Sequence, residues 1–253
     1  MLIIPTLDKL HALKLHGMRK AFEEQTMSSS YEDMSFADRV TLLVEREAME
    51  RENRNMTKRI SRARFKEQAV IENIKPSAGR GLDKTTLTTL AQCQWVRNKQ
   101  NIIMTGASGV GKTYLASALS HKACLIGHAV LYMRAAELNE QFRIGRVDGS
   151  FRKVLARYIR PAVLIVDDWA LCFMGEVEQK DFFELIEGRH QTGSTILTSQ
   201  TPVANWHGLM ENPTLADAIL DRLVHTALRV DLKGPSMRRP EAPNVDKEVP
   251  TPA

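Results

Sequence analysis

The chain has 253 residues, of which 43% are hydrophobic and 26% charged, and its 35 basic residues outnumber its 30 acidic residues. This composition is typical of a globular protein with enough length for one large domain or two modest ones, and the small positive charge weakly indicates an anionic partner. The early apolar run Leu2–Ile4 ends at Pro5 and indicates neither a transmembrane helix nor a signal peptide, so we expect a cytoplasmic protein without a membrane partner. The widely spaced Cys93, Cys124 and Cys172 disfavour a disulfide scaffold or a zinc site, and each is expected to be a small buried side chain.

Residues 1–75 are predicted to form a separate helical domain that binds DNA or a protein partner. Thr6 is expected to cap a first helix, and Ser35 to cap a long second helix with Asp38 in the place of a capping-box Glu. The first helix carries a broad apolar stripe, made of Leu7, Leu10, Leu13, Met18, Ala21 and Phe22. The second helix carries one apolar face, made of Phe36, Val40, Leu43 and Val44.

The second helix continues into a basic segment that contains no acidic residue between Asn53 and Lys66. The cations of this segment are Arg54, Lys58, Arg59, Arg62, Arg64 and Lys66. One interpretation is a solvated helix end, because runs of charge usually face solvent. Uncompensated cations would, however, destabilise the helix unless an anion neutralises them. We therefore favour a contact with the phosphates of nucleic acid.

A connector follows over residues 76–100. Pro76, Gly79 and Gly81 interrupt any helix at its start. The segment Leu82–Val96 is then predicted to be a helix that leads into the next strand.

The central motif is G-x-x-x-x-G-K-T, which runs from Gly106 to Thr113. In such a loop the backbone N–H groups and the N-terminus of the following helix bind phosphates, Lys112 reaches the β- and γ-phosphates, and the Thr113 hydroxyl binds Mg²⁺. The alternative is a glycine-rich turn that matches by chance, but Ile102–Met104 supply the strand and Gly127 ends the helix that the motif requires. We therefore predict a site for a nucleoside triphosphate and Mg²⁺, formed by Gly106, Ala107, Ser108, Gly109, Val110, Gly111, Lys112, Thr113 and Tyr114.

Trp95 lies shortly before this motif. We expect its side chain in the hydrophobic core, with a position beside an adenine ring as the alternative.

From residue 101 to about residue 200, predicted strands and helices alternate. This alternation is typical of an α/β fold with a parallel sheet and crossover helices. After the first strand, further strands are expected at 129–133, 162–166 and 194–200. Helices are expected at 114–126, 135–143, 150–160 and 178–190.

Polar residues follow two of these strands at the edge of the sheet where ligands of open α/β sheets bind. Asp167 is expected to hold Mg²⁺, directly or through water, and Asp168 to orient the attacking water. Ser199 and Gln200 are expected to contact the γ-phosphate. The alternatives are an ordinary loop start after one strand and ordinary strand termination after the other.

Beyond Gln200 we expect the sheet to end. An amphipathic helix is predicted over 214–225, and a short extended piece over 229–232. Together these elements give a predicted nucleotide-binding core with a minimal helical lid over residues 76–233. The proline-rich tail over 234–253 is expected to be disordered.

The phosphate loop, Val166–Trp169, Leu197–Gln200 and Ala218–His225 together resemble the IstB-type ATPases, the helper proteins of a bacterial insertion-sequence family. These proteins are similar to the helicase loader DnaC, within the initiator branch of the AAA+ ATPases. The resemblance covers roughly residues 5–240. The phosphate loop alone would identify only the wider class of ATPases, and the segments 200–207 and 233–238 make the match to the IstB type more specific.

The resemblance implies an AAA+ P-loop fold that binds ATP and Mg²⁺, preceded by a small all-α domain and followed by a helical lid. It also implies rings or spirals with ATP at the subunit boundaries, where Arg222 of one subunit would act as an arginine finger toward its neighbour. Arg238 is a weaker match, to the arginine that these ATPases use as their second sensor of the nucleotide. A helical insertion over 134–160 would face DNA through Arg143, Arg146, Arg152, Lys153 and Arg157.

Two residues depart from the usual family pattern. Asp168 stands where a Glu is usual, and Gln200 where an Asn is usual. Both changes keep the chemistry but alter the reach of the side chain, so we expect slow or DNA-stimulated hydrolysis.

The sequence thus predicts an ATPase that assembles on duplex DNA, holds and bends it, and recruits or stimulates a cognate transposase. We expect no DNA cleavage by this chain, because no third acidic residue joins Asp167 and Asp168 in a recognisable nuclease pattern. One alternative is a DnaC-like helicase loader, whose N-terminal domain would bind a helicase. A second alternative is a small-molecule kinase with a phosphate loop, which would be monomeric and unaffected by DNA.

Overall fold

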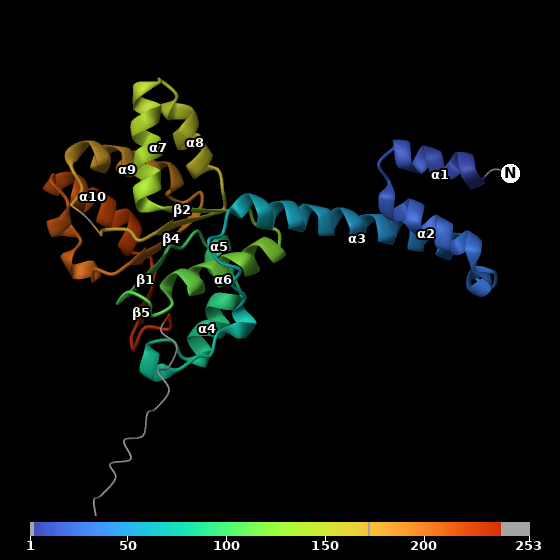
Figure 1. Ribbon diagram of the computed structural model, residues 1–253, viewed down its shortest axis with the longest axis horizontal. Helices are drawn as coiled ribbons and strands as arrows, with labels where there is room; N and C mark the ends of the chain where they lie inside the picture. The colour runs from blue at the N-terminus through green and yellow to red at the C-terminus, as the bar shows by residue number, and fades with distance from the viewer. Residues whose placement is uncertain (1–2, 172, 239–253) are drawn as a thin grey trace, which may run out of the picture. The chain divides into compact units, whose positions relative to one another are not determined.

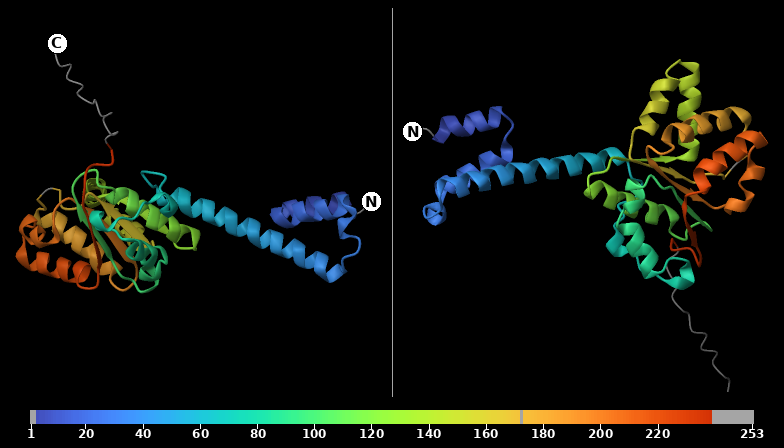
Figure 2. Two further views of the ribbon diagram at one scale, coloured as in Figure 1. Left: turned by 90° about the horizontal axis from the view of Figure 1, so that it is seen from below. Right: turned by 180° about the vertical axis from the view of Figure 1, so that it is seen from behind.

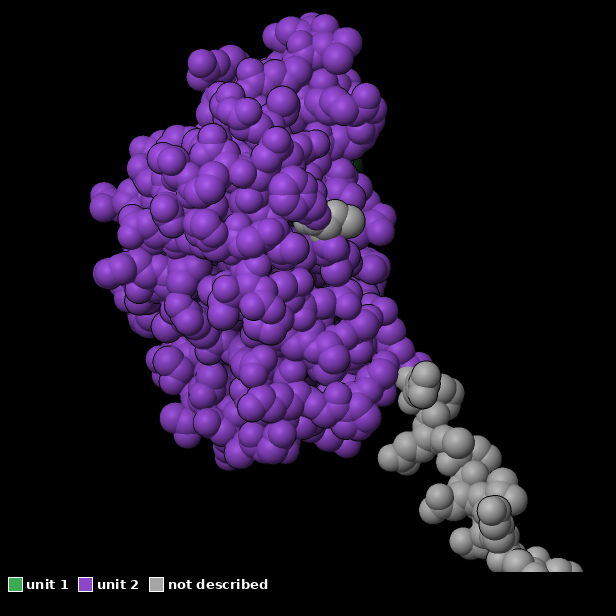
Figure 3. Space-filling model, turned by 90° about the vertical axis from the view of Figure 1, so that its left-hand side faces the viewer, with its two compact units in different colours: residues 1–61 green, residues 62–253 purple. Residues whose placement is uncertain are grey.

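The computed structural model describes residues 3–171 and 173–238, which divide after Ser61 into two units. One face of the second unit fills the view in Figure 3. The division lies before the expected boundary at residue 75, because the residues after Ser61 pack with the second unit. Within that unit the rings of Phe65 and His121 meet edge to face at 6.4 Å, and Ala69 is buried. The predicted disorder of residues 239–253 lies outside the described residues.

The first unit consists of helices, as expected, but its first helix is interrupted. Its elements are α1 (Ile3–Ala12), α2 (His16–Met27), the 3₁₀ turn η1 (Ser29–Tyr31) and α3 (Phe36–Ala63), whose last residues belong to the second unit. Lys14 adopts a left-handed backbone conformation with φ 59° between α1 and α2, and Thr6 lies inside α1 instead of capping it. The predicted cap of α3 is confirmed, because the Asp38 N–H donates to the Ser35 hydroxyl at 3.2 Å.

The expected apolar face of α3 is wrong. Phe36 is 84% exposed and Val44 is 52% exposed. Polar side chains instead join α3 to α2, and among them Glu47 is buried and accepts from the N–H groups of Gly17 at 2.8 Å and Met18 at 3.2 Å. A carboxylate of α3 therefore caps the N-terminus of α2.

The second unit contains one parallel five-stranded sheet in the order β2-β3-β4-β1-β5 among the described residues (Figure 1). Its strands are β1 (Ile102–Gly106), β2 (Val130–Arg134), β3 (Val163–Asp167), β4 (Ser194–Ser199) and β5 (Leu228–Leu232). The expectation that the sheet ends at Gln200 is wrong, because β5 pairs with β1 along its length. Val230 and Leu232 of this edge strand are buried, whereas Arg229 and Asp231, which alternate with them, are exposed.

Helices cover both faces of this sheet (Figure 2). They are α4 (Lys84–Ala91), α5 (Gln94–Arg97), α6 (Lys112–Leu125), α7 (Ala135–Val147), α8 (Phe151–Ile159), α9 (Glu176–Arg189) and α10 (Pro213–Val224), with 3₁₀ turns η2 (Ile71–Asn73), η3 (Ala78–Arg80), η4 (Val203–Asn205) and η5 (His207–Leu209). The helices α4–α6 lie on one face and α7–α10 on the other, with the expected helical pair α7 and α8 between β2 and β3. In the described part of the chain, no helix is both long and apolar enough to cross a membrane.

The predicted helix over 82–96 is divided into α4 and α5 by Cys93, whose φ is 55°. Trp95 is 2% exposed, and its indole N–H donates to the Leu90 carbonyl at 2.9 Å, so it belongs to the core as expected. Cys93 and Cys124 are buried, as predicted, and Cys172 lies outside the described residues.

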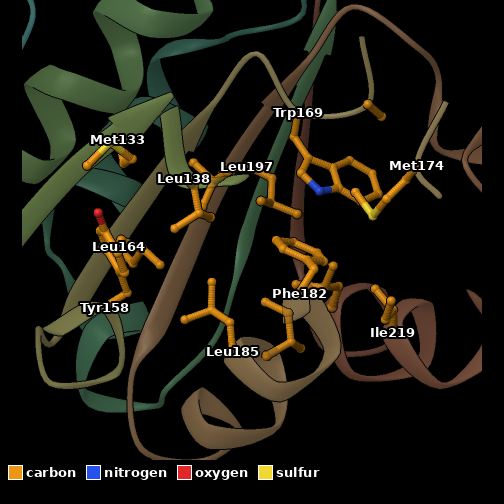
Figure 4. Close-up of a cluster of buried hydrophobic side chains, with 14 of the residues drawn as sticks. Met133, Leu138, Tyr158, Leu164, Trp169, Met174, Phe182, Leu185, Leu197 and Ile219 are labelled. Atoms are coloured by element: carbon orange, nitrogen blue, oxygen red, sulfur yellow. The ribbon is translucent and has the colours of Figure 1, made fainter. Parts of the chain in front are cut away.

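The core between the sheet and α7–α10 positions the end of β3 (Figure 4). Trp169 follows the two acids of that strand and packs on Phe182 of α9, with their ring centroids 5.5 Å apart. Trp206, which lies between η4 and η5, meets Trp169 edge to face at 4.3 Å. Both indoles are buried, so the turn after Asp168 is fixed by packing.

Candidate functional site

The phosphate loop connects β1 to α6, and its glycines are needed for its conformation. Gly106 and Gly109 have φ values of 142° and 82°. A Cβ added to Gly106 would lie 2.1 Å from the Leu232 carbonyl oxygen, and one added to Gly109 would lie 2.1 Å from the Ser236 hydroxyl oxygen. The Met237 N–H also donates to the Gly109 carbonyl at 2.9 Å. Residues 234–238, expected to belong to a disordered tail, therefore pack on the loop.

Lys112 is a largely buried cation at the start of α6. Its ammonium Nζ donates to the carbonyl oxygens of Gly106 at 2.7 Å and Ala107 at 2.8 Å. Burial lowers the pKa of Lys112, and the charges of Asp168 and Asp167 oppose this shift. A buried ammonium held by neutral carbonyls attracts an anion, so the side chain fits a phosphate group.

A cavity of about 800 Å³ opens beside this loop. Its wall contains the predicted residues Ser108, Gly109, Val110, Gly111, Lys112, Thr113, Tyr114, Asp168, Gln200 and Arg238. The connector supplies a second wall that the sequence did not indicate, with Asn73, Ile74, Pro76, Arg80 and Leu82. Lys66, assigned to DNA from the sequence, also lines this cavity. The volume and mixed lining suit a nucleotide.

Asp167 ends β3 and is fully buried. Its carboxylate accepts from the Thr113 hydroxyl at 3.0 and 3.1 Å, so the two residues predicted to hold Mg²⁺ lie together. Hydroxyl and carboxylate oxygens are the ligands that Mg²⁺ prefers, and this pair fits the ion.

Two further hydroxyl groups contact the same carboxylate, and no motif indicates either of them. Tyr132 of β2 donates to Asp167 Oδ2 at 2.7 Å, and Thr198 of β4 donates to Oδ1. Burial, followed by the bond to Asp167, raises the pKa of Tyr132, so its phenol is a neutral donor. Thr198 also accepts from the Asp168 N–H at 3.0 Å.

The residues expected to contact the γ-phosphate or to orient the attacking water differ in where they face. Gln200 is exposed and lines the cavity. Asp168 also lines the cavity, and its backbone is left-handed with a φ of 56°. Ser199 is buried outside the cavity lining, and its hydroxyl accepts from the Thr201 N–H at 3.1 Å. Its side chain therefore supports the turn after β4, and Gln200 is the residue that faces the cavity.

Arg222 lies apart from the nucleotide cavity of its own chain. From α10 it pairs with Glu187 of α9, donates to the Ala218 carbonyl at 3.0 Å and stands 5.1 Å from the Phe183 ring centroid. It lines a separate cavity of about 390 Å³ that also borders Asn101 at the start of β1. Arg238, by contrast, lines the nucleotide cavity.

Some cations in the basic segment of α3 have carboxylate partners that the sequence of the segment does not indicate. In the first unit, Arg54 lies 3.7 Å from Glu47 and Arg59 lies 2.7 Å from Glu52. Lys58 is exposed in the first unit, as are Arg62 and Arg64 in the second. These three have no ion pair within the described chain. The acidic partners Glu47 and Glu52 lie earlier in the same helix, before the basic segment begins at Asn53.

The cations of the helical pair also differ in their partners. Arg146 pairs with Asp181 of α9 and stands 3.7 Å above the Phe151 ring, so it holds α7 against its neighbours. Arg143 pairs with Glu140 at 2.7 Å. Arg152 is 88% exposed, and Lys153 and Arg157 are exposed.

This chain is similar to known ATP-binding proteins. The family model described as IstB-like ATP binding protein matches residues 8–243. The putative insertion sequence ATP-binding protein y4pL of Sinorhizobium fredii is 43% identical over 239 residues, which cover 94% of this chain and 98% of that protein. The putative ATP-binding protein of insertion sequence IS1162 of Pseudomonas fluorescens is 41% identical over 198 residues, covering 78% and 86%. The crystal structure of the DnaC helicase loader has a similar fold, with a TM-score of 0.53 at 18% identity, covering 65% of this chain and 97% of that chain.

Proposed function

Because this chain belongs to the family of IstB-like ATP-binding proteins and has an AAA+ P-loop fold, we propose that it is an ATPase that assembles on duplex DNA and recruits or stimulates a transposase. The observation that carries the proposal is the buried Lys112 ammonium next to Thr113 at the wall of the nucleotide cavity, with the Thr113 hydroxyl bonded to the buried Asp167. The curated relatives are themselves described as insertion sequence ATP-binding proteins.

ATP binding rests on the loop and on Lys112. The backbone N–H groups at the N-terminus of α6 bind the phosphates, and Lys112 leaves its carbonyl partners to neutralise them. Thr113 and Asp167 would hold Mg²⁺, which neutralises charge on the β- and γ-phosphate oxygens when bound. The fit of these residues to MgATP is the geometric support for the proposal.

Hydrolysis requires a group that orients water and a group that stabilises the developing charge. Asp168 and Gln200 line the cavity and serve the first purpose, with Asp168 reaching less far than a Glu would. Arg238 contributes charge from the same chain. Arg222 does not line this cavity, and we propose that it completes the site of a neighbouring subunit, which makes hydrolysis depend on self-association into a ring or spiral.

DNA binding is assigned to the exposed cations that lack a strong internal partner. These are Lys58, Arg62, Arg64, Arg152, Lys153 and Arg157. Such side chains bind phosphates without reading sequence, in keeping with a protein that assembles on DNA of varied sequence. Arg54, Arg59, Arg143 and Arg146 would have to give up carboxylate partners to do so and contribute less.

The test is Lys112→Ala, compared with Lys84→Ala at an exposed position in α4. In sedimentation with duplex DNA and a non-hydrolysable ATP analogue, the wild type and Lys84→Ala should form large assemblies. Lys112→Ala should remain small, because the phosphates lose their buried countercharge. Assembly of Lys112→Ala at the wild-type level would refute the proposal.

A helicase loader is the second candidate, since the fold is shared with the DnaC helicase loader. It predicts a preference for single-stranded DNA or for a helicase partner. Titration of duplex and single-stranded DNA of equal length with ATP present separates the two functions. A clear single-strand preference would favour the loader.

A further inference from the structure

The carboxylate of Asp167 is held from three sides. Thr113 of α6 approaches both oxygens at 3.0 and 3.1 Å, Tyr132 of β2 donates to Oδ2 at 2.7 Å, and Thr198 of β4 donates to Oδ1. Asp167 itself is 0% exposed, so water cannot replace any of these donors without entering the core. The pairing of Thr113 with Asp167 belongs to the phosphate-loop motif, whereas the other two contacts do not.

We propose that Tyr132 and Thr198 are positioning residues that fix the orientation of the Asp167 carboxylate for Mg²⁺. The proposal rests on the proposed function, because it assumes that the Thr113–Asp167 pair holds the ion. The terminal torsion of an Asp side chain is soft, so its carboxylate orientation is set by hydrogen bonds. One donor on each oxygen, from opposite neighbouring strands, stops the group from rotating.

The position of Tyr132 requires a long side chain with a terminal donor. In the β2–β3 register Tyr132 lies beside Ile165, and Arg134 lies beside Asp167. The phenol therefore reaches along the sheet to the end of β3, which a shorter hydroxyl side chain could not do. Phe would fill the same space and remove only the donor.

Thr198 connects this carboxylate to the second acid. Its hydroxyl donates to Asp167 and accepts from the Asp168 N–H at 3.0 Å, and its carbonyl accepts from the Trp169 N–H at 2.8 Å. These bonds support the left-handed backbone of Asp168, a conformation that is unfavourable for a non-glycine residue. One side chain of β4 thus aligns the metal-holding acid and the water-orienting acid.

The first test is Tyr132→Phe, measured as the Mg²⁺ dependence of equilibrium binding of a non-hydrolysable ATP analogue. Partners of metal-binding residues are typically worth 10- to 100-fold in metal affinity, so the half-saturating Mg²⁺ concentration should rise about 10-fold. Analogue affinity in EDTA should stay at the wild-type value. Tyr158→Phe is the matched control, because Tyr158 is also buried and its hydroxyl has no hydrogen-bond partner among the described residues. That variant should match the wild type.

The second test compares Thr198→Val with Thr198→Ser. Val keeps the shape but removes both hydroxyl bonds, so it should shift the Mg²⁺ midpoint at least as far as Tyr132→Phe. Ser keeps the hydroxyl and should restore a midpoint within about threefold of the wild type.

Two results would overturn the positioning role. One is a wild-type Mg²⁺ midpoint in Tyr132→Phe. The other is an equal loss of analogue affinity with and without Mg²⁺, which would indicate a purely structural effect. Failure of the proposed function looks different, since the wild type would then bind the analogue without any Mg²⁺ dependence, or Lys112→Ala would bind it normally.

Discussion

Replacing Glu47 by Ala should loosen the first unit more than any exposed charge change in the same helix. Glu47 is a buried carboxylate of α3 that caps α2 through the N–H groups of Gly17 and Met18. It also accepts from Arg51 at 2.7 Å and lies 3.7 Å from Arg54. Alanine removes the cap and leaves the Gly17 N–H buried without a partner.

The magnitude follows from these contacts. Loss of an N-cap costs about 1 kcal/mol, and a buried donor left without a partner costs about 1–3 kcal/mol. The half-exposed pair with Arg51 adds less than about 1 kcal/mol. The total of about 2–5 kcal/mol is large for a small unit, whose stability is expected to be about 3–9 kcal/mol at the usual value per residue.

Native-state hydrogen exchange of the α2 amides measures this effect directly. Glu52→Ala is the matched control, because Glu52 lies on the same helix, is 62% exposed and pairs only with Arg59 in the first unit. Both variants place Ala in α3, so their changes in helix propensity cancel. Exchange of Gly17 and Met18 should accelerate by at least 10-fold in Glu47→Ala and change little in Glu52→Ala. Equal exchange in the two variants would refute the capping role.

The same contact predicts a pH dependence. Burial raises the pKa of Glu47, but hydrogen bonds from Arg51, Met18 and Gly17 outweigh it, and the folded pKa lies below the ordinary value of 4.5. The carboxylate therefore contributes stability that is present above pH 4.5 and is lost as the pH falls through the lower folded value. Protection of the α2 amides should decline in that acidic range in the wild type. Glu47→Gln should remove this part of the decline.

Two further predictions concern ATP turnover and DNA. Arg222→Ala should spare nucleotide binding and reduce hydrolysis by about 10³-fold. Mixing this variant with Lys112→Ala should restore part of the activity, because one subunit supplies an intact Lys112 and its neighbour an intact Arg222. No recovery on mixing would contradict a site shared between subunits. Neutralising Lys58 and Arg62 together should lower the slope of log affinity against log salt by up to about one unit for each DNA phosphate that the variant no longer binds. The internally paired Arg146→Gln should leave it unchanged, and an unaltered slope in the double variant would show that those two cations face solvent.

The local motifs were predictable because their chemistry fixes residue types at short spacing. The loop from Gly106 to Thr113 and the acids after β3 needed no knowledge of distant contacts. For β5 the sequence predicts only a short extended piece, because Arg229 and Asp231 alternate with its apolar residues and its buried face is defined only by β1 beside it.

Side-chain contacts between different strands could not be predicted from the sequence. Tyr132, Asp167 and Thr198 meet because β3 lies between β2 and β4, and strand order is not encoded in any one of the three segments. The ion pairs of the basic segment also depend on residues outside it. No acidic residue occurs between Asn53 and Lys66, but Arg59 pairs with Glu52, seven positions earlier in the helix.

The edge-to-face pair of Trp169 and Trp206 gives the protein a built-in optical probe. Their ring centroids are 4.3 Å apart, close enough for the two indole transitions to couple and to give a strong near-ultraviolet circular dichroism signal. Trp169 directly follows Asp168, and Trp206 lies on the segment that leads to α10. A change in the backbone of the acidic pair would tilt one indole against the other. Any rearrangement at β3 on addition of nucleotide would therefore be visible in the unlabelled protein, with the Trp206→Phe spectrum as its baseline.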